Sequence, residues 1–358
     1  MKTIYIFFRS LAFRCQKMPD INCAIVFLMF AISANVNSQT ISAGWSHSSN
    51  LCGNNLYGWG ANSFGQVGNG LLVDSYTPVQ TFNTSGIRII SAGYRHTLML
   101  RTDSTVWAFG DNTYGQLGNG NNTSTPIAVK TNGLNQVISI SGGKAGYHSL
   151  ALKVDGTVWA WGRNSEGQLG NGTTTDSNVP IQVLGLTDVI AIAGGEYHSL
   201  AIKSDGTVWA WGRNNEGQLG DGSNTNSNVP VQVLISDIIK ISGGRYFSMA
   251  LKNDGTVWTF GQNGHGQLGN GTTTNSNTPV QVTGLTNVEH ISGAAFHAMA
   301  ILDDGSLYSW GRNDYGQLGD GTTTNSSLAI QIAGISNVIE IAGGTNYSLA
   351  KTDRKSVV

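Results

Sequence analysis

Five of the seven histidines occupy one position in a repeated unit, and imidazole is a side chain suited to metal binding or proton transfer near neutral pH. These five are His47, His96, His148, His198 and His297. Phe247 and Tyr347 fill the same position in two other units. A metal or acid–base site could not accept those two substitutions. The pattern therefore predicts histidines that pack between repeats in a structural role and bind no metal.

Other arrangements that could carry chemistry are weaker. Asp303 and Asp304 are the nearest acidic pair for a glycosidase, but they lie at a hairpin-turn position that aspartates share in other repeats. The Gly-rich segments lack the following helix that a phosphate loop needs. Loops rich in Asn and Thr, such as residues 171–178, hold at most two carboxylates, too few for calcium. We predict no catalytic residue, no metal and no cofactor, and therefore a protein that is not an enzyme.

A Gly-Gln-Leu/Val-Gly-Asn/Asp-Gly segment marks each repeat, and successive copies are 50, 52, 50, 49 and 50 residues apart. The copies begin at Gly65, Gly115, Gly167, Gly217, Gly266 and Gly316. Residues 189–233 show the unit most clearly, as four short stretches rich in β-branched and aromatic residues joined by turns. Four short antiparallel strands per unit of this length are typical of a propeller blade.

Aromatic pairs recur in register in the third predicted strand, and the tryptophan pairs are Trp159, Trp161, Trp209 and Trp211. Residues two apart on a strand point to the same face of the sheet. A single blade cannot bury enough apolar surface to offset the entropy lost on ordering fifty residues. We therefore predict that these rings pack against neighbouring blades.

The repeat resembles that of the regulator of chromosome condensation family. Over residues 40–350 it combines Ala/Ser-Gly-Gly-x-Tyr-His-Ser-Leu-Ala-Leu, Asp-Gly-Thr-Val-Trp-Ala-Trp-Gly-x-Asn and Gly-Gln-Leu-Gly-Asn-Gly. The resemblance implies an all-β, seven-bladed β-propeller. The strand-opening motif occurs a seventh time at residues 339–350 without a seventh Gly-Gln segment. We predict six full blades and a partial seventh in residues 39–350, an off-register tail at 351–358, and an unpaired edge on the partial blade.

Residues 1–38 lie outside the repeat and predict a secretory signal peptide. Basic residues precede an apolar run at Ala24–Ala31, and Val36 and Ser38 supply small residues at the −3 and −1 positions before Gln39. The run is shorter than the ~20 residues that a membrane span needs. We therefore expect a secreted, periplasmic or cell-surface protein with no membrane span after cleavage. Cys52 would then be the only cysteine left and a free thiol.

The chain carries a formal net charge of −1, and only 11% of its residues are charged. No basic block follows the first 38 residues, so nucleic acid is excluded as a partner class. The informative positions are those that vary inside the constant frame. Just before each Gly-Gln lie the predicted rim residues Phe64, Tyr114, Glu166, Glu216, His265 and Tyr315. After each Trp/Phe-Gly lie Ala61, Asp111, Arg163, Arg213, Gln262 and Arg312.

Aromatic and charged residues on one shared rim resemble the composition of a protein interface. We expect an exported, non-enzymatic propeller that binds a protein or a polysaccharide through one loop-rich face, with its oligomeric state left open. A guanine nucleotide exchange factor-like regulator of a small GTPase is an alternative that the family's nuclear members imply. Their activity resembles insertion of an extended loop, whereas the largest insertion here is about two residues, at Lys144-Ala145.

Two further alternatives stay open. A secreted hydrolase or lyase on a propeller scaffold would require an acid pair that faces one cleft. Ultraviolet sensing, as in the plant photoreceptor that shares the fold, resembles a use of Gly-Trp-Arg-His-Thr motifs. Here only Trp45, in Gly44-Trp45-Ser46-His47-Ser48, is similar.

Overall fold

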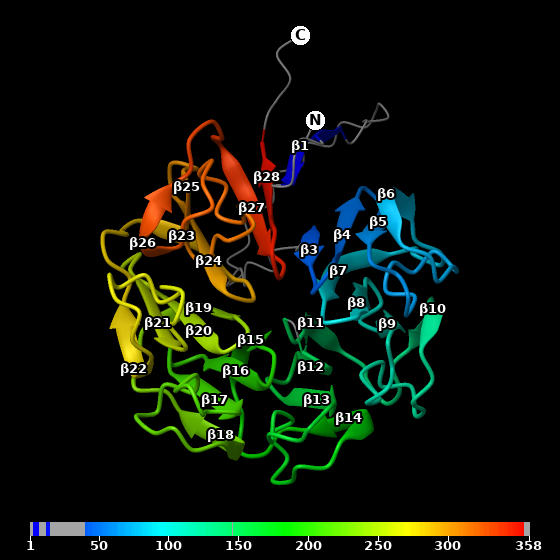
Figure 1. The fold of residues 1–358 in the computed structure, drawn as a ribbon. Coiled ribbons are helices and arrows are strands. Elements are labelled where there is room, and N and C mark those ends of the chain that lie inside the picture. Colours follow the sequence, from blue (N-terminus) through cyan, green and yellow to red (C-terminus); the bar gives the residue numbers. More distant parts are fainter. Residues whose placement is uncertain (1–2, 7–11, 15–39, 145, 354–358) are drawn as a thin grey trace, which may run out of the picture.

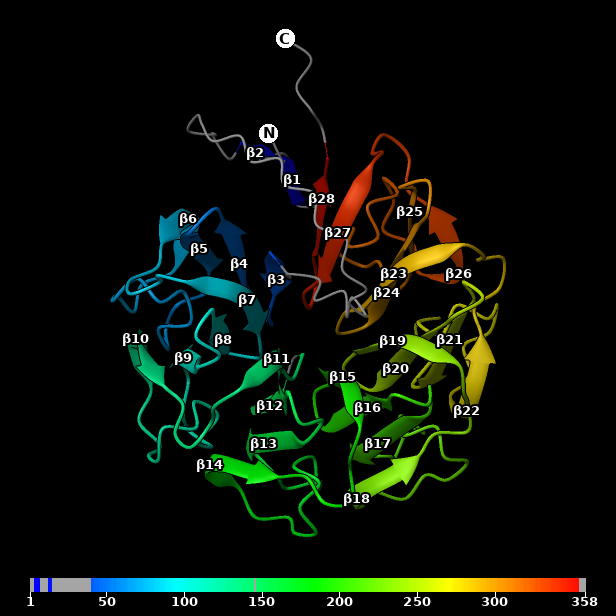
Figure 2. The same cartoon turned by 180° about the vertical axis from the view of Figure 1, so that it is seen from behind.

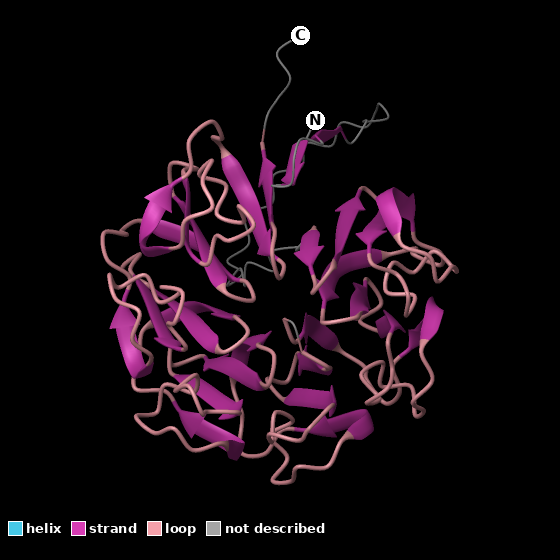
Figure 3. Ribbon diagram, in the orientation of Figure 1, coloured by secondary structure: helices cyan, strands magenta, loops and turns pink. Residues whose placement is uncertain are grey.

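The computed structural model describes residues 3–6, 12–14, 40–144 and 146–353. Its regular elements within these ranges are all strands, gathered in seven four-stranded sheets around a central axis (Figures 1 and 3). No helix in the described ranges is long and apolar enough to cross a membrane. The expected all-β propeller is confirmed.

Six blades are each built from one contiguous stretch, with the first strand innermost. Blade 1 contains β3 (Ile41–Ala43), β4 (His47–Cys52), β5 (Asn55–Gly60) and β6 (Ser75–Gln80). Blade 2 contains β7 (Ile87–Ala92), β8 (His96–Arg101), β9 (Val106–Gly110) and β10 (Thr125–Lys130). Blade 3 contains β11 (Val137–Gly142), β12 (His148–Lys153), β13 (Val158–Gly162) and β14 (Ser177–Gln182).

The next three blades repeat the same plan. Blade 4 contains β15 (Val189–Gly194), β16 (His198–Lys203), β17 (Val208–Gly212) and β18 (Ser227–Gln232). Blade 5 contains β19 (Ile238–Gly243), β20 (Phe247–Lys252), β21 (Val257–Gly261) and β22 (Ser276–Gln281). Blade 6 contains β23 (Val288–Gly293), β24 (His297–Leu302), β25 (Leu307–Gly311) and β26 (Ser326–Gln331).

The seventh blade joins both ends of the chain. Its repeat-derived strands are β27 (Val338–Gly343) and β28 (Ser348–Thr352), and the sheet continues through β1 (Thr3–Ile6) and β2 (Ala12–Arg14). Six full blades and a partial seventh are therefore confirmed, and Figure 2 shows the same closure from behind. The expected unpaired edge is wrong, because β1 pairs antiparallel with β28.

The sequence explains why β1 can take that place. Residues 3–6 read Thr-Ile-Tyr-Ile and follow the pattern of residues 105–108, Thr-Val-Trp-Ala, where the third strand of blade 2 begins. The pairing follows too, since Tyr5 lies opposite Ala350 as Trp107 lies opposite Met99. These strands fall inside the segment assigned to a signal peptide, whose apolar run and cleavage site lie outside the described residues.

Two smaller expectations change at the chain ends. β28 continues to Thr352, two residues into the tail predicted at 351–358, and residues 354–358 lie outside the described part. Cys52 is disulfide-bonded in the full chain, whereas the free thiol was predicted for a chain without residues 1–38.

The core lies between blades. Trp161 of blade 3 is fully buried in a cluster with Leu98 and Leu117 of blade 2, and Trp211 joins Leu150 and Leu169 of the preceding blade in the same way. Trp159 and Trp209 lie at the margins of these clusters and are half-buried. The predicted packing of aromatic rings between blades is present, with the second ring of each pair taking the larger share.

Candidate binding face

One edge of every full blade carries the variable positions. In an antiparallel blade the end of the first strand, the start of the second and the end of the third meet at the same edge. The loops at that edge hold the predicted rim residues and the residues that precede each repeat histidine. We call this surface the aromatic–arginine face; its members are Trp45, Phe64, Tyr94, Arg95, Tyr114, Tyr147, Arg163, Tyr197, Arg213, Arg245, Tyr246, His265, Phe296, Arg312 and Tyr315.

The constant segment fixes the backbone from which each rim side chain projects. In blade 2 the Tyr114 amide donates to Gln116 Oε1 at 2.9 Å, and the Leu117 amide donates to Asn112 Oδ1 at 2.9 Å. Gly115 has a φ of 82°, and a Cβ there would lie 2.4 Å from Cα of Asn178 in blade 3. The Gly-Gln pair is therefore required for the turn and for close blade packing, while the rim side chain is left to vary.

The predicted rim residues have different surroundings. Tyr315 is 54% exposed, and its ring lies under the Arg312 guanidinium at 5.3 Å. Glu166 and Glu216 accept hydrogen bonds from Asn226 and Asn275 of the next blade, at 2.8 and 2.6 Å. These two carboxylates are therefore partly committed to holding neighbouring loops together.

The remaining three rim residues contact a second set that sequence reasoning missed. The Tyr114 ring lies 5.1 Å from Tyr147, and His265 lies 5.6 Å from Phe296. The Arg95 guanidinium lies 4.8 Å from the ring of Phe64. The partners Tyr147, Phe296 and Arg95 each come directly before a repeat histidine. Their fixed position before the histidine was visible in the sequence. They were missed because they belong to a second loop, which lies beside the loop of the rim residues only in the folded protein.

Arginines alternate with aromatic rings around the face. Arg163 lies 5.2 Å from the Tyr114 ring and 5.0 Å from the Tyr197 ring. Arg213 lies 5.9 Å from Tyr197 and 4.8 Å from Tyr246. Each guanidinium thus lies within cation–π range of one ring from its own blade or the preceding one and one ring from the next blade. The contacts form one continuous network over blades 2 to 5.

Arg245 links the network to the opposite side of the ring. Its guanidinium lies 5.2 Å from the ring of Trp45 in blade 1, 5.0 Å from Phe296, and forms a short ion pair with Glu196. Burial raises the pKa of Glu196, although Arg245 beside it acts in the opposite direction. Burial also raises the pKa of Tyr197 to about 12, with the Glu196 charge adding to the shift.

The repeat histidines lie beneath this face and connect successive blades. His148 Nε2 lies 3.0 Å from Ser199 Oγ, and that hydroxyl donates to the Gln168 carbonyl at 2.9 Å. Because the hydroxyl hydrogen is used, His148 must donate from Nε2. The same contact recurs from His47 to Thr97, His96 to Ser149, His198 to Ser248 and His297 to Ser348.

Tyr347 closes the same series between blades 7 and 1. Its hydroxyl donates to the His47 carbonyl at 2.6 Å and accepts from Ser48 Oγ at 3.0 Å. Beside it, Glu340 Oε1 accepts from the amides of Thr40 and Ile41, at 2.6 and 2.9 Å. These contacts join the last described strands to the first strand of blade 1.

The histidines are held in a neutral state. Burial lowers the pKa of His47 and His148 to about 4, and that of His198 to about 3. Across the described ranges, no three His, Cys, Asp or Glu side chains gather as a metal site. A structural role for the series stays a prediction, and its geometry gives a direct test through the hydroxyl partners.

Sequence comparison decides the family. The profile of the RCC1-like domain matches residues 24–239 and 147–358. The chain belongs to the RCC1-like domain family. A curated relative, the ultraviolet-B receptor UVR8 of Arabidopsis thaliana, is 42% identical over 81 residues, which cover 22% of this chain and 18% of the receptor. The match therefore spans a small part of that relative's length.

Solved structures share the fold of this RCC1-like propeller. Human WBSCR16 superposes with a TM-score of 0.79 at 24% identity, covering 89% of this chain and 88% of that one. Prp20p from Saccharomyces cerevisiae superposes with a TM-score of 0.79 at 22% identity, covering 88% and 82%. The Prp20p structure is described with its binding to Gsp1p and histones. Likeness at these identities shows the fold alone.

Proposed function

We propose that this RCC1-like protein is an exported, non-enzymatic propeller that binds a protein partner through the aromatic–arginine face. The fold supports a protein-binding propeller, as in the relatives. The observation that carries the choice of face is the continuous alternation of arginines and aromatic rings over blades 2 to 5. Arg, Tyr and Trp are the residues that most often dominate binding energy in protein interfaces.

The geometry of the arginines suggests what the partner presents. A guanidinium stacked between two rings keeps its N–H edge open for a bidentate carboxylate. Arg163 and Arg213 are held in this way. Arg163 Nε donates to Ser165 Oγ at 3.1 Å, whereas Arg213 Nε is buried without a hydrogen-bond partner in the described structure. The stacked arginines are thus fixed in position before a partner arrives, which lowers the entropy lost on binding.

Charge is unevenly distributed over the face. Arg245 pairs with Glu196 and Arg312 with Asp314, whereas the ion pairs of the described residues include none for Arg95, Arg163 or Arg213. In blades 2 to 4 these three guanidinium groups therefore have no ion pair among the described residues, although the charge of Arg213 also acts on Glu196. Acidic side chains of the partner would pair with the arginines of blades 2 to 4. Arg245 and Arg312 in blades 5 and 6, whose charges are already paired, would contribute packing contacts.

Export is the second part of the proposal. It rests on the apolar run at Ala24–Ala31, the small residues at Val36 and Ser38, and the low charge of the repeats. An exported chain would meet its partner outside the cytosol, which disfavours regulation of a small GTPase. A polysaccharide stacked on the aromatic rings is the competing ligand class on the same face.

Affinity capture with matched variants tests the proposal. The full chain, in which β1 pairs with β28, is immobilised, culture medium is passed over it, and retained molecules are identified by mass spectrometry and sugar analysis. Arg163→Gln with Arg213→Gln removes both stacked charges; Lys153→Gln with Lys203→Gln is the control at the opposite edge of blades 3 and 4.

The proposal predicts a protein that the wild type and the lysine control retain and the arginine variant loses. Retention of a glycan alone would identify a polysaccharide-binding propeller. Equal retention of the protein by all three chains would overturn the assignment of the face.

A further inference from the structure

The first strands of all seven blades line a central cavity of about 590 Å³. Isoleucines and serines line this wall in blades 2, 3, 5 and 6. The serine hydroxyls accept hydrogen bonds from the next blade: Ser42 Oγ from the Ala92 amide at 2.9 Å, and Ser242 Oγ from the Gly293 amide at 3.0 Å. Each such hydroxyl keeps its own hydrogen for a further acceptor, so the wall offers donors to the cavity.

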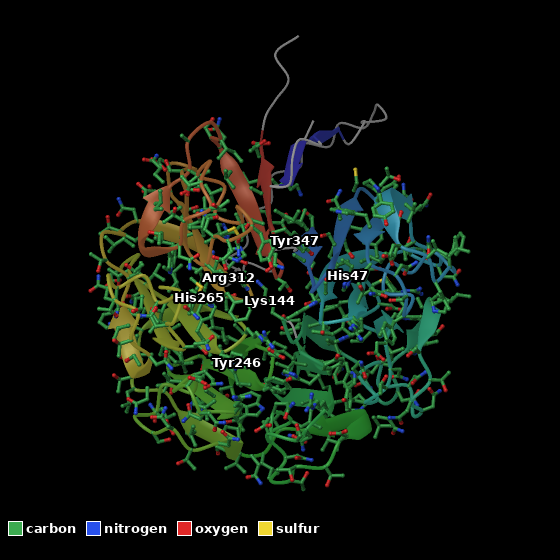
Figure 4. All side chains as sticks on the ribbon, in the orientation of Figure 1. His47, Lys144, Tyr246, His265, Arg312 and Tyr347 are labelled. Atoms are coloured by element: carbon green, nitrogen blue, oxygen red, sulfur yellow. The ribbon has the colours of Figure 1, made fainter. Side chains whose placement is uncertain are left out.

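Lys144 reaches across this cavity. It lies where blade 3 has two residues more than the other repeats, between β11 and β12, and it appears close to the centre of the ring in Figure 4. Its Nζ donates to Ser292 Oγ at 2.8 Å and to the Gly293 carbonyl at 2.7 Å, both in blade 6. An ammonium has three donors, so one remains for another acceptor.

A second basic group lies on the same strand of blade 6. His290 precedes Ser292 by two residues, lines the cavity with it, and is separated from it by roughly 6.6 Å along the strand. Lys240 of blade 5 lies beside it, with Nζ 3.3 Å from His290 Nδ1 and a hydrogen bond to the Glu289 carbonyl. Burial lowers the pKa of His290 and the Lys240 charge adds to this shift, whereas the charges of Glu289 and Glu340 act in the opposite direction.

The carboxylate of Glu340 lines the cavity and already has hydrogen-bond and ion-pair partners. Glu340 accepts from the Thr40 amide, the Thr40 hydroxyl and the Ile41 amide, and forms an ion pair with Lys351 at 3.3 Å. No carboxylate forms an ion pair with Lys144 or Lys240 in the described structure. Burial lowers the pKa of Lys144 to about 8, so its ammonium carries an unfavourable desolvation that an anion would relieve.

We propose that the central cavity is a binding site for a small multivalent oxyanion of the phosphate class. Lys144 Nζ and the Lys240–His290 pair would hold it from two sides along β23, with serine hydroxyls of neighbouring blades as further donors. A dianion suits this site because neither the Lys144 nor the Lys240 ammonium forms an ion pair among the described residues, although the charge of Glu289 also acts on Lys240. The site lies inside the channel and does not depend on the proposed partner face.

Inorganic phosphate is the probe, used with the full chain at fixed ionic strength against chloride. Phosphate should raise the melting temperature of the wild type in a saturable way. Lys144→Met keeps the length and apolar stem of the side chain and should remove the effect. Lys240→Met should weaken the apparent affinity at least tenfold. Lys130→Met, at an exposed outer-strand position, should leave the effect unchanged.

A second readout covers variants that fold poorly. In the wild type, bound phosphate should raise the pKa of His290, followed by NMR through the imidazole resonances, because a nearby dianion favours the imidazolium. Absence of any saturable effect of phosphate on the wild type would overturn the proposal. So would the same stabilisation and the same His290 shift in a folded Lys144→Met chain.

Discussion

Phe247 of blade 5 and Ala298 of blade 6 share one buried apolar cluster at the place where five other blade pairs join a histidine to a hydroxyl. Phe247 cannot donate, and Ala298 cannot accept. The carbonyl of Gln267 that a hydroxyl at residue 298 would reach still receives Trp310 Nε1 at 3.0 Å. Both ends of the contact have therefore changed together, and no buried polar group there is left without a partner.

Transplanting this pair between blades 3 and 4 tests whether the histidine series is structural. Ser199→Ala leaves the buried Nε2–H of His148 without an acceptor, which should cost about 1–3 kcal/mol. Adding His148→Phe removes that donor, and the Gln168 carbonyl keeps Trp211 Nε1 at 2.8 Å. Urea unfolding should therefore find the double variant more stable than Ser199→Ala alone. A double variant that is less stable than Ser199→Ala, by the further loss expected for removing His148, would argue against a structural role for the series.

The same histidines should make the fold sensitive to acid. Their pKa values are about 3 to 4 in the folded chain, against 6.5 when exposed. Above pH 6.5 both states are neutral and the free energy of unfolding is unaffected. As pH falls from 6.5 toward 4, only the unfolded chain gains protons, so stability should fall by about 1.4 kcal/mol per pH unit for each histidine.

Urea midpoints measured between pH 7 and pH 4.5 check this slope. The double variant His148→Phe, Ser199→Ala has one titrating histidine fewer, so its stability should fall less steeply over the same window. An identical pH dependence in the two chains would contradict burial of a neutral His148.

The two tryptophans of one strand should differ in importance. Trp211 is fully buried and donates to the Gln168 carbonyl, whereas Trp209 is half-buried at the margin of its cluster. Trp211→Ala should cost about 3–5 kcal/mol of unfolding free energy, and Trp209→Ala clearly less. Chemical denaturation of both variants gives the comparison, and equal losses would show that the outer ring carries as much packing energy as the inner one.

Rim tyrosines should matter for binding and little for folding. Tyr114→Ala with Tyr315→Ala should weaken capture of the partner by about 2 kcal/mol or more, since Tyr114 supports Arg163 and Tyr315 is exposed beside Arg312. Tyr76→Ala is the matched control, because Tyr76 is 88% exposed on an outer strand away from the face. A binding loss of the same size in the control would point to a general effect of removing surface tyrosines.

The processed chain should begin at Gln39 or its cyclised form. Mass spectrometry of protein from the medium or periplasm measures this directly. Recovery from the cytosol of a chain that still begins at Met1 would contradict export, and would agree with β1 remaining paired to β28.

The repeat predicted most of the fold, because glycine turns, alternating strands and aromatic pairs recur with one period. It did not predict the role of residues 3–6, since one four-residue copy of the strand pattern, far in sequence from β28, does not stand out as a repeat. Nor did it predict that the insertion at Lys144 would cross the channel, because its acceptors at Ser292 and Gly293 lie three blades away. Rim positions were visible as variable residues in a constant frame, but their arginine and aromatic partners belong to a separate loop.

Hydrogen exchange of the propeller with and without its captured partner tests the central claim most directly. The account predicts slower exchange on binding at residues 94–95, 163–166 and 213–216, which belong to the aromatic–arginine face. It predicts no change at the opposite turns, residues 153–157 and 203–207. Protection confined to those turns, with exchange at the face unaltered, would contradict it.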